Sequence, residues 1–332
     1  MKTKIINKIR EFISKHNLIN LNKTYIIAVS GGPDSVCLMD ILSKIYKNNK
    51  KNFIIAYIHH GLRKEADKEI HFVKKISTGY GFSFYCRKIK INKQKGKSIE
   101  NEARKKRYQS LKDLAKKKGC DGIITGHTLD DQAETILLNM LRGSGLTGLC
   151  GMRPEVKIGR NKSVSIIRPL LFISKKDILE YLEKEKLKFQ TDKSNFDLKY
   201  RRNYIRYKIL PVIEKINTGF KKNIGNLSII LQADSDFIKS KAEYYYKRIS
   251  ENFIDNIVID FKKFTLLPIA LQREIVKKVI KEITKSLYSP PFIIIEEIRE
   301  KIIKKKLPVK IQKLSIKIFF KDKKIYFQKD KK

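Results

Sequence analysis

The stretch "YIIAVSGGPDSVCLMDIL" (residues 25–42) constrains the fold of this chain more than any other segment. It begins with an apolar, β-prone run, which is typical of a strand that is buried on both faces. "VCLMDIL" then carries apolar residues at helical spacing. The turn between them, residues 30–35, contains a proline, which suits the first turn of a helix because its missing N–H costs nothing there. We therefore predict a buried strand, a tight turn and a helix.

The predicted turn is suited to a bound anion. Gly31 and Gly32 permit a positive φ and let a ligand approach the backbone closely. Free amides at a helix N-terminus favour negative charge, and phosphate is the usual ligand. The turn is not a Walker P-loop, because it lacks the Gly-Lys-Ser/Thr ending, and it is not GxGxxG. A tight glycine turn without a ligand is the alternative interpretation.

Strand and helix patterns alternate from residue 24 to about residue 126. The strand patterns cover residues 52–60, 81–89 and 121–127, and the helical patterns cover residues 64–79 and 98–118. This alternation predicts an α/β fold with a doubly wound parallel sheet, in which ligands collect at the carboxyl ends of the strands. A further strand is expected within residues 164–172.

The pattern changes near residue 216. Residues 217–250 and 268–287 each have the pattern of a long helix, and the tail alternates with period two around "KDKK". We expect two domains, an α/β domain over residues 1–216 and a smaller, mainly helical domain over residues 217–332 that ends in a β-hairpin.

The formal net charge of +40 favours nucleic acid as a partner, because a positive field attracts polyanions. Most of the basic residues are lysines, however, and an A/T-rich genome also produces such a bias on solvated surfaces. The four cysteines lie far apart without a CxxC pair, which indicates reduced thiols. There is no run of about 18 apolar residues and no signal-peptide pattern. We therefore expect a cytoplasmic protein that is not bound to a membrane.

A second group of candidate site residues lies in "GHTLDDQAETILLNMLRGSGLTGLCGM" (residues 126–152). If a helix begins just after the histidine, four side chains fall three or four residues apart along one face: His127, Asp130, Asp131 and Glu134. Together they indicate a metal or acid–base cluster beside the glycine turn. A carboxylate at a helix N-terminus is also favourable on electrostatic grounds alone.

Basic residues mark three more segments. The glycine-rich loop "LRGSGLTGL" carries Arg142 and is either a linker or part of a substrate gate. "SIENEARKKRY" (residues 98–108) places Arg104 and Arg107 on one helical face, where an arginine can neutralise charge that develops on phosphate. In "DKSNFDLKYRRNYIRYKILP" (residues 192–211), basic and aromatic side chains interleave, which suits contact with nucleic acid. A solvated basic surface is the alternative for the last two segments.

In these motifs the chain resembles the bacterial tRNA(Ile)-lysidine synthases, a family of PP-loop ATP pyrophosphatases. The glycine turn has their SGGxDS signature, and the resemblance continues through "HHGLR", "SIENEARKKRY", the segment from residue 126, "IRPLLF" and the segment from residue 192, in that order. It covers residues 24–216, whereas residues 217–332 match only in general character. No counterpart of the second C-terminal domain of longer members is expected.

The resemblance implies a fold like that of the adenine nucleotide α-hydrolases and the activity of a ligase that forms a carbon–nitrogen bond. These enzymes use ATP to adenylate the wobble cytidine of tRNA(Ile) with a CAU anticodon, and they release pyrophosphate. The amine of free L-lysine then displaces AMP, which gives lysidine and changes decoding from methionine to isoleucine. Residues 1–216 would bind ATP and carry catalysis, and residues 217–332 would bind tRNA. A homodimer is compatible with the resemblance, as is the plastid stroma if the chain is organelle-encoded.

The resemblance also implies roles for the residues quoted above. The ATP phosphates would lie against the turn, which consists of Ser30, Gly31, Gly32, Pro33, Asp34 and Ser35. Mg²⁺ would be held by Asp34 and Asp130. The catalytic residues would be Asp34, Arg107, His127, Asp131 and Arg202. The side chains that contact tRNA or lysine would be Arg104, Glu134, Arg142 and Arg206.

Two other functions stay open at this point. A related tRNA thiolation enzyme would use paired cysteines for a persulfide or an iron–sulfur cluster, and the chain has no CxxC. A non-catalytic nucleotide- and RNA-binding protein would need the glycine turn and the basic surface but not His127, Asp131 or Arg107. A tRNA-dependent assay of pyrophosphate release separates these functions.

Overall fold

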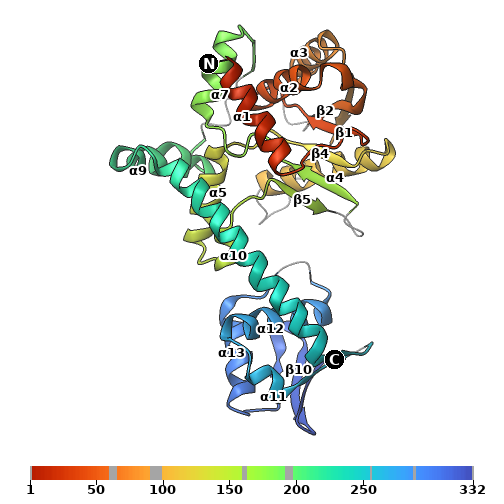
Figure 1. Cartoon of the computed structure of the whole chain (residues 1–332), viewed down its shortest axis with the longest axis vertical. Helices are drawn as coiled ribbons and strands as arrows, with labels where there is room; N and C mark the ends of the chain where they lie inside the picture. Colours follow the sequence, from red (N-terminus) through yellow and green to blue (C-terminus); the bar gives the residue numbers. More distant parts are fainter. Residues whose placement is uncertain are drawn as a thin grey trace. The chain divides into compact units, whose positions relative to one another are not determined.

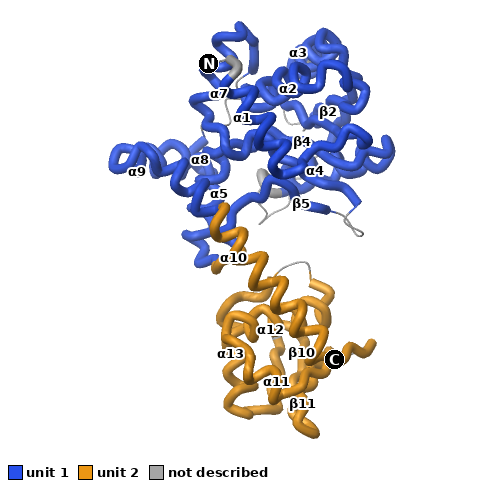
Figure 2. Tube along the Cα trace, viewed as in Figure 1, with its two compact units in different colours: residues 1–144, 148–228 blue, residues 145–147, 229–332 orange. Residues whose placement is uncertain are grey.

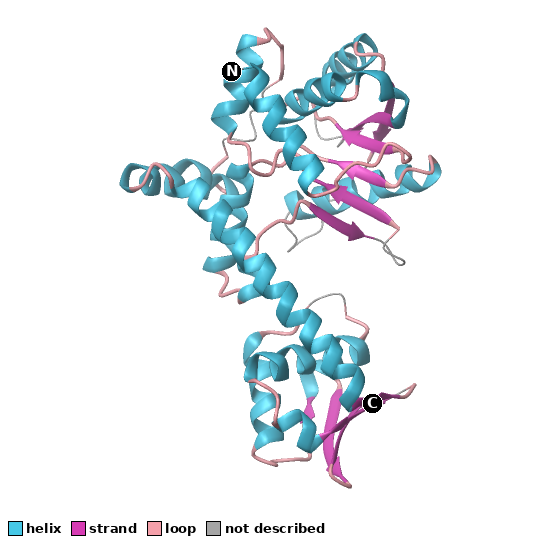
Figure 3. Ribbon diagram, viewed as in Figure 1, coloured by secondary structure: helices cyan, strands magenta, loops and turns pink. Residues whose placement is uncertain are grey.

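The computed structural model describes residues 2–59, 66–89, 99–158, 163–190, 197–254, 256–286 and 289–330. The chain forms two compact units, shown in different colours in Figure 2. The first unit contains residues 1–144 and 148–228, and the second contains residues 145–147 and 229–332. Each unit has its own hydrophobic core and its own sheet, and the strands are drawn in magenta in Figure 3.

The first unit is built around a mainly parallel sheet. Its described strands are β1 (Tyr25–Ala28), β2 (Phe53–His59), β3 (Ser83–Lys88), β4 (Gly122–Ile124), β5 (Glu155–Ile158) and β6 (Val164–Ile167). They lie in the order β3-β2-β1-β4-β6-β5, and neighbouring strands run parallel except for β5, which pairs antiparallel with β6. The predicted doubly wound α/β fold is confirmed, with an antiparallel edge strand that was not expected.

Helices cover both faces of this sheet (Figure 1). The helical segments before residue 217 are α1 (Lys2–Lys15), α2 (Pro33–Ile45), η1 (Lys47–Asn52), α3 (Ala66–Gly79), α4 (Ile99–Lys117), α5 (Leu129–Leu141), α6 (Leu146–Leu149), α7 (Lys175–Lys184), α8 (Arg201–Tyr204), η3 (Ile205–Ile209) and α9 (Leu210–Ile216). Ile27 of β1 packs toward α1, α2, α3 and α7, whereas Ile26 packs toward α4. Strand β1 is therefore buried on both faces, as its unbroken apolar run predicts.

The order of the strands places the carboxyl ends of β1 and β4 at one point of the sheet. From β1 the chain continues through α2 to β2 on one side, and after β3 it returns through α4 to β4 on the other side of β1. Ligands in such sheets bind where the strand order reverses. The segments after β1 and β4 meet there, because a Cβ on Gly126 would lie 3.1 Å from the backbone carbon and oxygen of Asp34.

The second unit combines helices with an antiparallel sheet. Its described strands are β7 (Ser250–Asn252), β8 (Asn256–Asp260), β9 (Val309–Ile311), β10 (Ile316–Lys321) and β11 (Lys324–Lys329), in the order β7-β8-β11-β10-β9. Its helical segments are α11 (Phe261–Thr265), α12 (Ile269–Thr284), α13 (Phe292–Ile303) and η4 (Gln312–Leu314), together with α10 (Phe220–Ile249), which crosses the boundary between the units. The predicted hairpin is β10–β11. Among the described residues, no helix has both the length and the apolar composition to cross a membrane.

A buried amide fixes α5 in the first unit. The side chain of Gln132 is fully buried; its Nε2 donates to the carbonyl of Met152 at 2.9 Å and to Ser228 Oγ at 2.7 Å. Its Oε1 accepts from the Met152 N–H at 2.7 Å. Gly151 has a φ of +62°, and a Cβ there would lie 2.8 Å from Gln132 Oε1. The glycine is therefore required both by the backbone conformation and by the buried amide.

The substitution Gly151→Ala should lower the free energy of unfolding by roughly 2–4 kcal/mol, because it adds strain at positive φ to a clash in a packed core. Gly119→Ala is the matched control, since Gly119 has the same φ of +62° with no atom within 4 Å of its Cβ position. It should cost only about 1 kcal/mol. Urea denaturation of the two variants measures the difference, and equal losses would contradict the assigned contact.

Candidate active site

The turn after β1 has the backbone that its glycines predict, with one difference. Gly31 has a φ of +84°, and a Cβ there would lie 3.3 Å from Val73 and 3.4 Å from Gln190 Oε1. Gly32 has a φ of −73° and caps α2, with Pro33 in the first turn of the helix. Only Gly31 of these two therefore uses the left-handed region, and Gly32 serves the approach of a ligand or the cap.

The two serines of the turn bind each other and the backbone. Ser35 Oγ donates to the carbonyl of Gly32 at 2.9 Å and accepts from the Ser30 N–H at 3.2 Å. The two hydroxyl oxygens lie 3.3 Å apart. These bonds hold the turn in shape before a ligand arrives, and Ser30 is exposed at its rim.

Asp34 carries a buried oxygen that has no partner among the described residues. Its Oδ1 is inaccessible and unpaired, and its Oδ2 lies 3.7 Å from Lys175 Nζ. Burial raises the pKa of Asp34 to about 6, against the charge of Lys175, which lowers it. An orphaned carboxylate oxygen fits Mg²⁺, which proteins commonly bind through one or two carboxylates together with substrate phosphates.

Asp130 is held differently. Its Oδ2 accepts from the Lys175 N–H at 2.7 Å, and its Oδ1 pairs with Lys221 Nζ at 2.7 Å. Within the part of the chain that the structure describes, no group of three or more histidine, cysteine or acidic side chains is arranged to hold a metal ion. Of the two carboxylates expected to hold a metal ion, Asp34 is thus the one with an unpaired oxygen.

The N-terminus of α5 is a capping box. Thr128 is the N-cap; its Oγ1 accepts from the Asp131 N–H at 3.3 Å, and Asp131 Oδ2 accepts from the Thr128 N–H at 2.9 Å. This reciprocal pair fixes both the start of the helix and the direction of the Asp131 carboxylate.

Two arginines pair with the carboxylates of α5. The Glu134 side chain is fully buried, and its oxygens accept from Arg202 Nε at 2.6 Å and from Arg206 Nε at 2.5 Å. Asp131 Oδ1 lies 2.9 Å from Arg202 Nη2 and 3.4 Å from Arg206 Nη2. Although burial opposes ionisation of Asp131, Arg202 and its other neighbours outweigh it and lower its pKa to about 2. We call these four side chains the ionic clamp.

A π-helical turn lies between α8 and α9 and belongs to the same helical run as the two arginines. In this turn the Leu210 N–H donates to the carbonyl of Ile205, five residues back. Pro211 explains the departure from α-helical bonding, because it has no N–H and its ring crowds the carbonyl four residues earlier. Ile205 and Leu210 are both buried against α5, beside Ala133 and Leu137.

His127 is held in one tautomer by a chain of hydrogen bonds. Thr125 Oγ1 donates to the carbonyl of Ile167 at 3.3 Å, so it accepts from His127 Nδ1–H at 2.9 Å. The lone pair of Nε2 then faces the hydroxyl of Tyr108 at 3.5 Å. Burial lowers the pKa of His127 to about 3, and nearby arginines add to the effect. The imidazole is therefore neutral at physiological pH.

Tyr108 lies among cationic side chains. The guanidinium carbons of Arg107 and Arg104 lie 5.5 Å and 5.9 Å from its ring centre. Arg168, which is buried, donates to the carbonyl of Arg153 at 2.7 Å and also bonds Tyr108, while its Nε has no partner among the described residues. This end of the site is positively charged and suits an anion.

The structure brings most of the predicted residues together. The turn and the segment after β4 meet at Asp34 and Gly126, and Arg202 pairs with Asp131. Arg104 and Arg107 lie beside Tyr108, whose hydroxyl faces His127. Asp130 points instead to Lys175 and Lys221, so the predicted single face of four side chains is divided between two directions. Arg142 caps the far end of α5, about two turns beyond Glu134. The motif residues His60 and Arg63 and the segment 191–196 lie outside the described residues.

Sequence reasoning missed Lys175, Thr125 and Arg168 as members of this site. Arg168 lies in "IRPLLF", which carries part of the resemblance, but nothing in the sequence marks its side chain as buried beside Tyr108. Lys175 is one lysine among many, and only the fold places it between Asp34 and Asp130. Thr125 precedes His127 by two residues, and this closeness in sequence was the one sign that it could contact the histidine.

The tautomer of His127 is testable by heteronuclear NMR of histidine-labelled protein. The proton should reside on Nδ1, and the ring should not titrate between pH 5 and 8. Thr125→Val should shift the proton to Nε2, whereas Thr125→Ser should preserve the pattern. A signal with Nε2 protonated in the unmodified chain, assigned through His127→Gln, would contradict the hydrogen-bond chain.

The same pKa shift has a consequence for stability. The folded-state pKa of His127 lies below the ordinary value of 6.5, so the unfolded chain binds a proton that the folded chain does not. This residue should therefore lower stability as the pH falls from about 6.5 toward 3. The pH dependence of unfolding should be weaker in His127→Gln, which cannot take up that proton.

Comparison with known proteins identifies related sequences. The tRNA(Ile)-lysidine synthase of Thermosipho africanus is 36% identical over 241 residues, which cover 71% of this chain and 55% of that protein. The enzyme of the same name from Clostridioides difficile is 33% identical over 288 residues, which cover 84% of this chain and 60% of that protein. The chain thus spans between 55 and 60% of the length of these two relatives.

A solved structure shows the same fold. The U34-tRNA thiolase NcsA from Methanococcus maripaludis, described with its [4Fe-4S] cluster, aligns with a TM-score of 0.60 over 69% of this chain and 78% of that chain, at 22% identity. A family model described as a PP-loop domain matches residues 1–213, which include the glycine turn, the capping box and the ionic clamp. The chain belongs to the PP-loop domain family.

Proposed function

We propose that the chain is a tRNA(Ile)-lysidine synthase, a ligase that joins free lysine to the wobble cytidine of tRNA with a CAU anticodon at the expense of ATP. The observation that carries the proposal is the unpaired Asp34 oxygen at the glycine turn, next to the end of β4 where His127 and Asp131 stand. The names of the curated relatives support it.

ATP lies with its phosphates against the turn after β1. The positive end of α2 and the exposed Ser30 face the phosphates, and Gly31 gives the turn its backbone through a positive φ. Asp34 would hold a magnesium ion, and that ion would supply positive charge toward the departing pyrophosphate. Arg107 and Arg104, which flank Tyr108, stabilise the same charge from the side of α4.

The cytidine and lysine occupy the α5 side of the site. His127 acts as a hydrogen-bonding partner of the base rather than as a proton acceptor, because its pKa is lowered to about 3. Asp131 stays ionised at neutral pH and attracts the ammonium group of lysine. Arg202, which already contacts Asp131, is positioned to reach the adenylated intermediate, and Arg206 and Glu134 hold it in place.

The two parts of the chain have different roles in the proposed reaction. Residues 1–216 carry ATP binding and catalysis, and residues 217–332 bind tRNA through a surface rich in lysine. This division of labour, a homodimeric state and a cytoplasmic location are part of the proposal.

The decisive experiment incubates the protein with ATP, labelled lysine and either of the two tRNAs that carry a CAU anticodon, followed by nucleoside analysis. Lysidine should form in the isoleucine tRNA, with release of AMP and pyrophosphate, and not in the methionine tRNA. Pyrophosphate release without incorporation of lysine would point to another modification such as thiolation. Binding of tRNA without any turnover of ATP would point to a non-catalytic RNA-binding protein.

Arg107→Ala should reduce lysidine formation by about 100-fold or more, because it removes a charge that stabilises the departing pyrophosphate. Lys105→Ala is the matched control, since Lys105 is an exposed cation two residues away on the same helix. Steady-state incorporation of labelled lysine measures both variants, and thermal unfolding confirms that they fold. Near-normal turnover in Arg107→Ala would remove this residue from the mechanism.

A further inference from the structure

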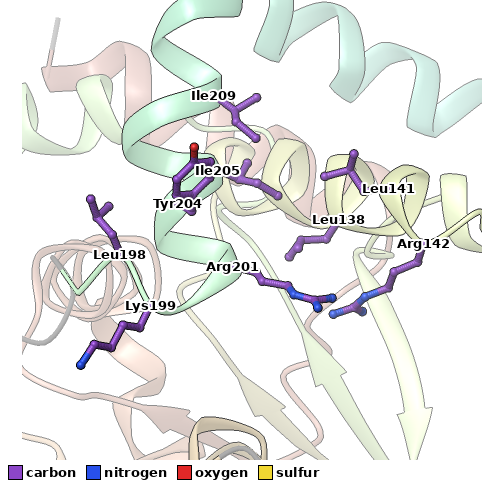
Figure 4. Close-up of a pocket in the computed structure, with 9 residues that line it drawn as sticks. All are labelled: Leu138, Leu141, Arg142, Leu198, Lys199, Arg201, Tyr204, Ile205 and Ile209. Atoms are coloured by element: carbon purple, nitrogen blue, oxygen red, sulfur yellow. The ribbon is translucent and has the colours of Figure 1, made fainter.

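A pocket of about 440 Å³ lies between α5 and the helix that carries Arg202 and Arg206. It is formed by the C-terminal end of α5 together with residues 198–209 (Figure 4). Its volume is in the range of small-ligand sites. None of the residues of the ionic clamp lines it.

Neighbouring faces of the helix at residues 201–209 line the pocket and the clamp. Arg202 and Arg206 face Glu134, whereas Arg201, Tyr204 and Ile205 line the pocket. Leu138 also lines the pocket, and it follows Glu134 by about one turn of α5. A ligand in the pocket therefore lies next to the ionic clamp.

The polar groups of the pocket are cationic. Arg142, Lys199 and Arg201 line it, and no acidic residue does. Figure 4 shows the guanidinium groups of Arg142 and Arg201 extending toward each other from different helices. None of the hydrogen bonds or ion pairs found within the described ranges involves these two side-chain groups. Two converging guanidinium groups repel each other, so the arrangement favours an anion between them.

The walls of the pocket are mostly apolar. Leu138, Leu141, Ile205 and Ile209 form them together with Tyr204, whose side chain is half exposed. Leu141 is 71% exposed, although it is a large aliphatic side chain. Nucleobases bind such surfaces by stacking on aromatic rings, while their phosphates pair with arginine. An amphipathic ligand with an anionic group matches this chemistry.

We propose that the pocket binds an unpaired RNA nucleotide that flanks the nucleotide being modified. Its base lies against Tyr204 and the aliphatic wall, and its phosphate lies between Arg142 and Arg201. RNA as the source of this nucleotide rests on the proposed function, and the pocket adds a second RNA subsite to the one at His127. Occupancy of the pocket holds the RNA beside the helix that presents Arg202 to the site.

The test measures the affinity of a CAU anticodon stem-loop RNA by fluorescence anisotropy at several salt concentrations and without ATP. Tyr204→Ala should weaken binding about tenfold, because base–aromatic stacking contributes about 1–3 kcal/mol. Tyr204→Phe should bind as the unmodified chain does. Arg201→Ala should weaken binding and reduce the salt dependence by about one counterion.

Two variants provide matched controls on the same elements. Lys215→Ala removes an exposed cation from the same helical run, outside residues 192–211 and away from the pocket, and Met140→Ala truncates an exposed apolar side chain next to Leu141. Both should keep the RNA affinity within twofold, whereas Leu141→Ala should weaken it severalfold. The mutated side chains are largely exposed, and thermal unfolding verifies that each variant folds.

The outcomes separate this inference from the proposed function. If the unmodified chain forms lysidine but Tyr204→Ala and Arg201→Ala bind RNA as their controls do, the pocket is not an RNA subsite. If the pocket variants lose affinity while no lysidine forms, the pocket binds RNA and the proposed reaction is wrong. An equal loss of affinity for double-stranded RNA would overturn the stacking of an unpaired base.

Discussion

The candidate site depends on burying the charge of Glu134. A carboxylate taken out of water is costly unless it is paired and hydrogen-bonded, and here two guanidinium groups satisfy both of its oxygens. The pairing ties the helix at residues 201–209 to α5. It also leaves Arg202 in contact with Asp131, so one arrangement of charges fixes the position of a catalytic candidate and of the helix that covers it.

Around the Glu134 pairing, the positive side chains outnumber the negative ones. Asp131 and Glu134 meet Arg202 and Arg206, and Arg104, Arg107 and Arg168 add further positive charge on the side of Tyr108. The excess is positive, which suits the polyphosphate and the nucleic acid of the proposed reaction. His127 contributes no charge of its own at neutral pH, because burial and these arginines keep it neutral. The site thus separates a cationic region around Tyr108 from a neutral imidazole that can form hydrogen bonds.

Much of the first unit could be predicted from the sequence, because its signals are local. The strand, the glycine turn and the proline at the start of α2 follow from residue preferences, and the capped start of α5 follows from helical spacing. Helix α1 was not predicted, although Ile5, Ile9 and Ile13 recur every four residues and are buried. Nothing local marked the short edge strand β5. Three strands of the second sheet were also missed: β7 and β9 are only three residues long, and β8 pairs with β11, which lies far away in the chain.

The residues that belong to the site could be predicted better than their arrangement in space. Helical spacing predicted that the side chains of Asp130 and Asp131 share one face of α5. In the structure, the Asp130 side chain points toward Lys221 instead. The difference arises because α7 offers a backbone N–H and α10 offers a lysine ammonium group on that side, and their position is a property of the fold. For the same reason the buried Arg168 and the bridging Lys175 could not be recognised in advance.

The π-helical turn gives the helical run one residue more than regular α-helical bonding would. An α-helix advances about 100° per residue, so removing one residue from this turn would rotate Leu210 and the rest of α9 relative to Arg202 by that angle. Either the arginines would then leave Glu134 or the aliphatic side chains would leave α5. Length in this segment is thus more tightly constrained than side-chain identity, and a related chain that lost a single position here would have to rebuild both halves of the contact.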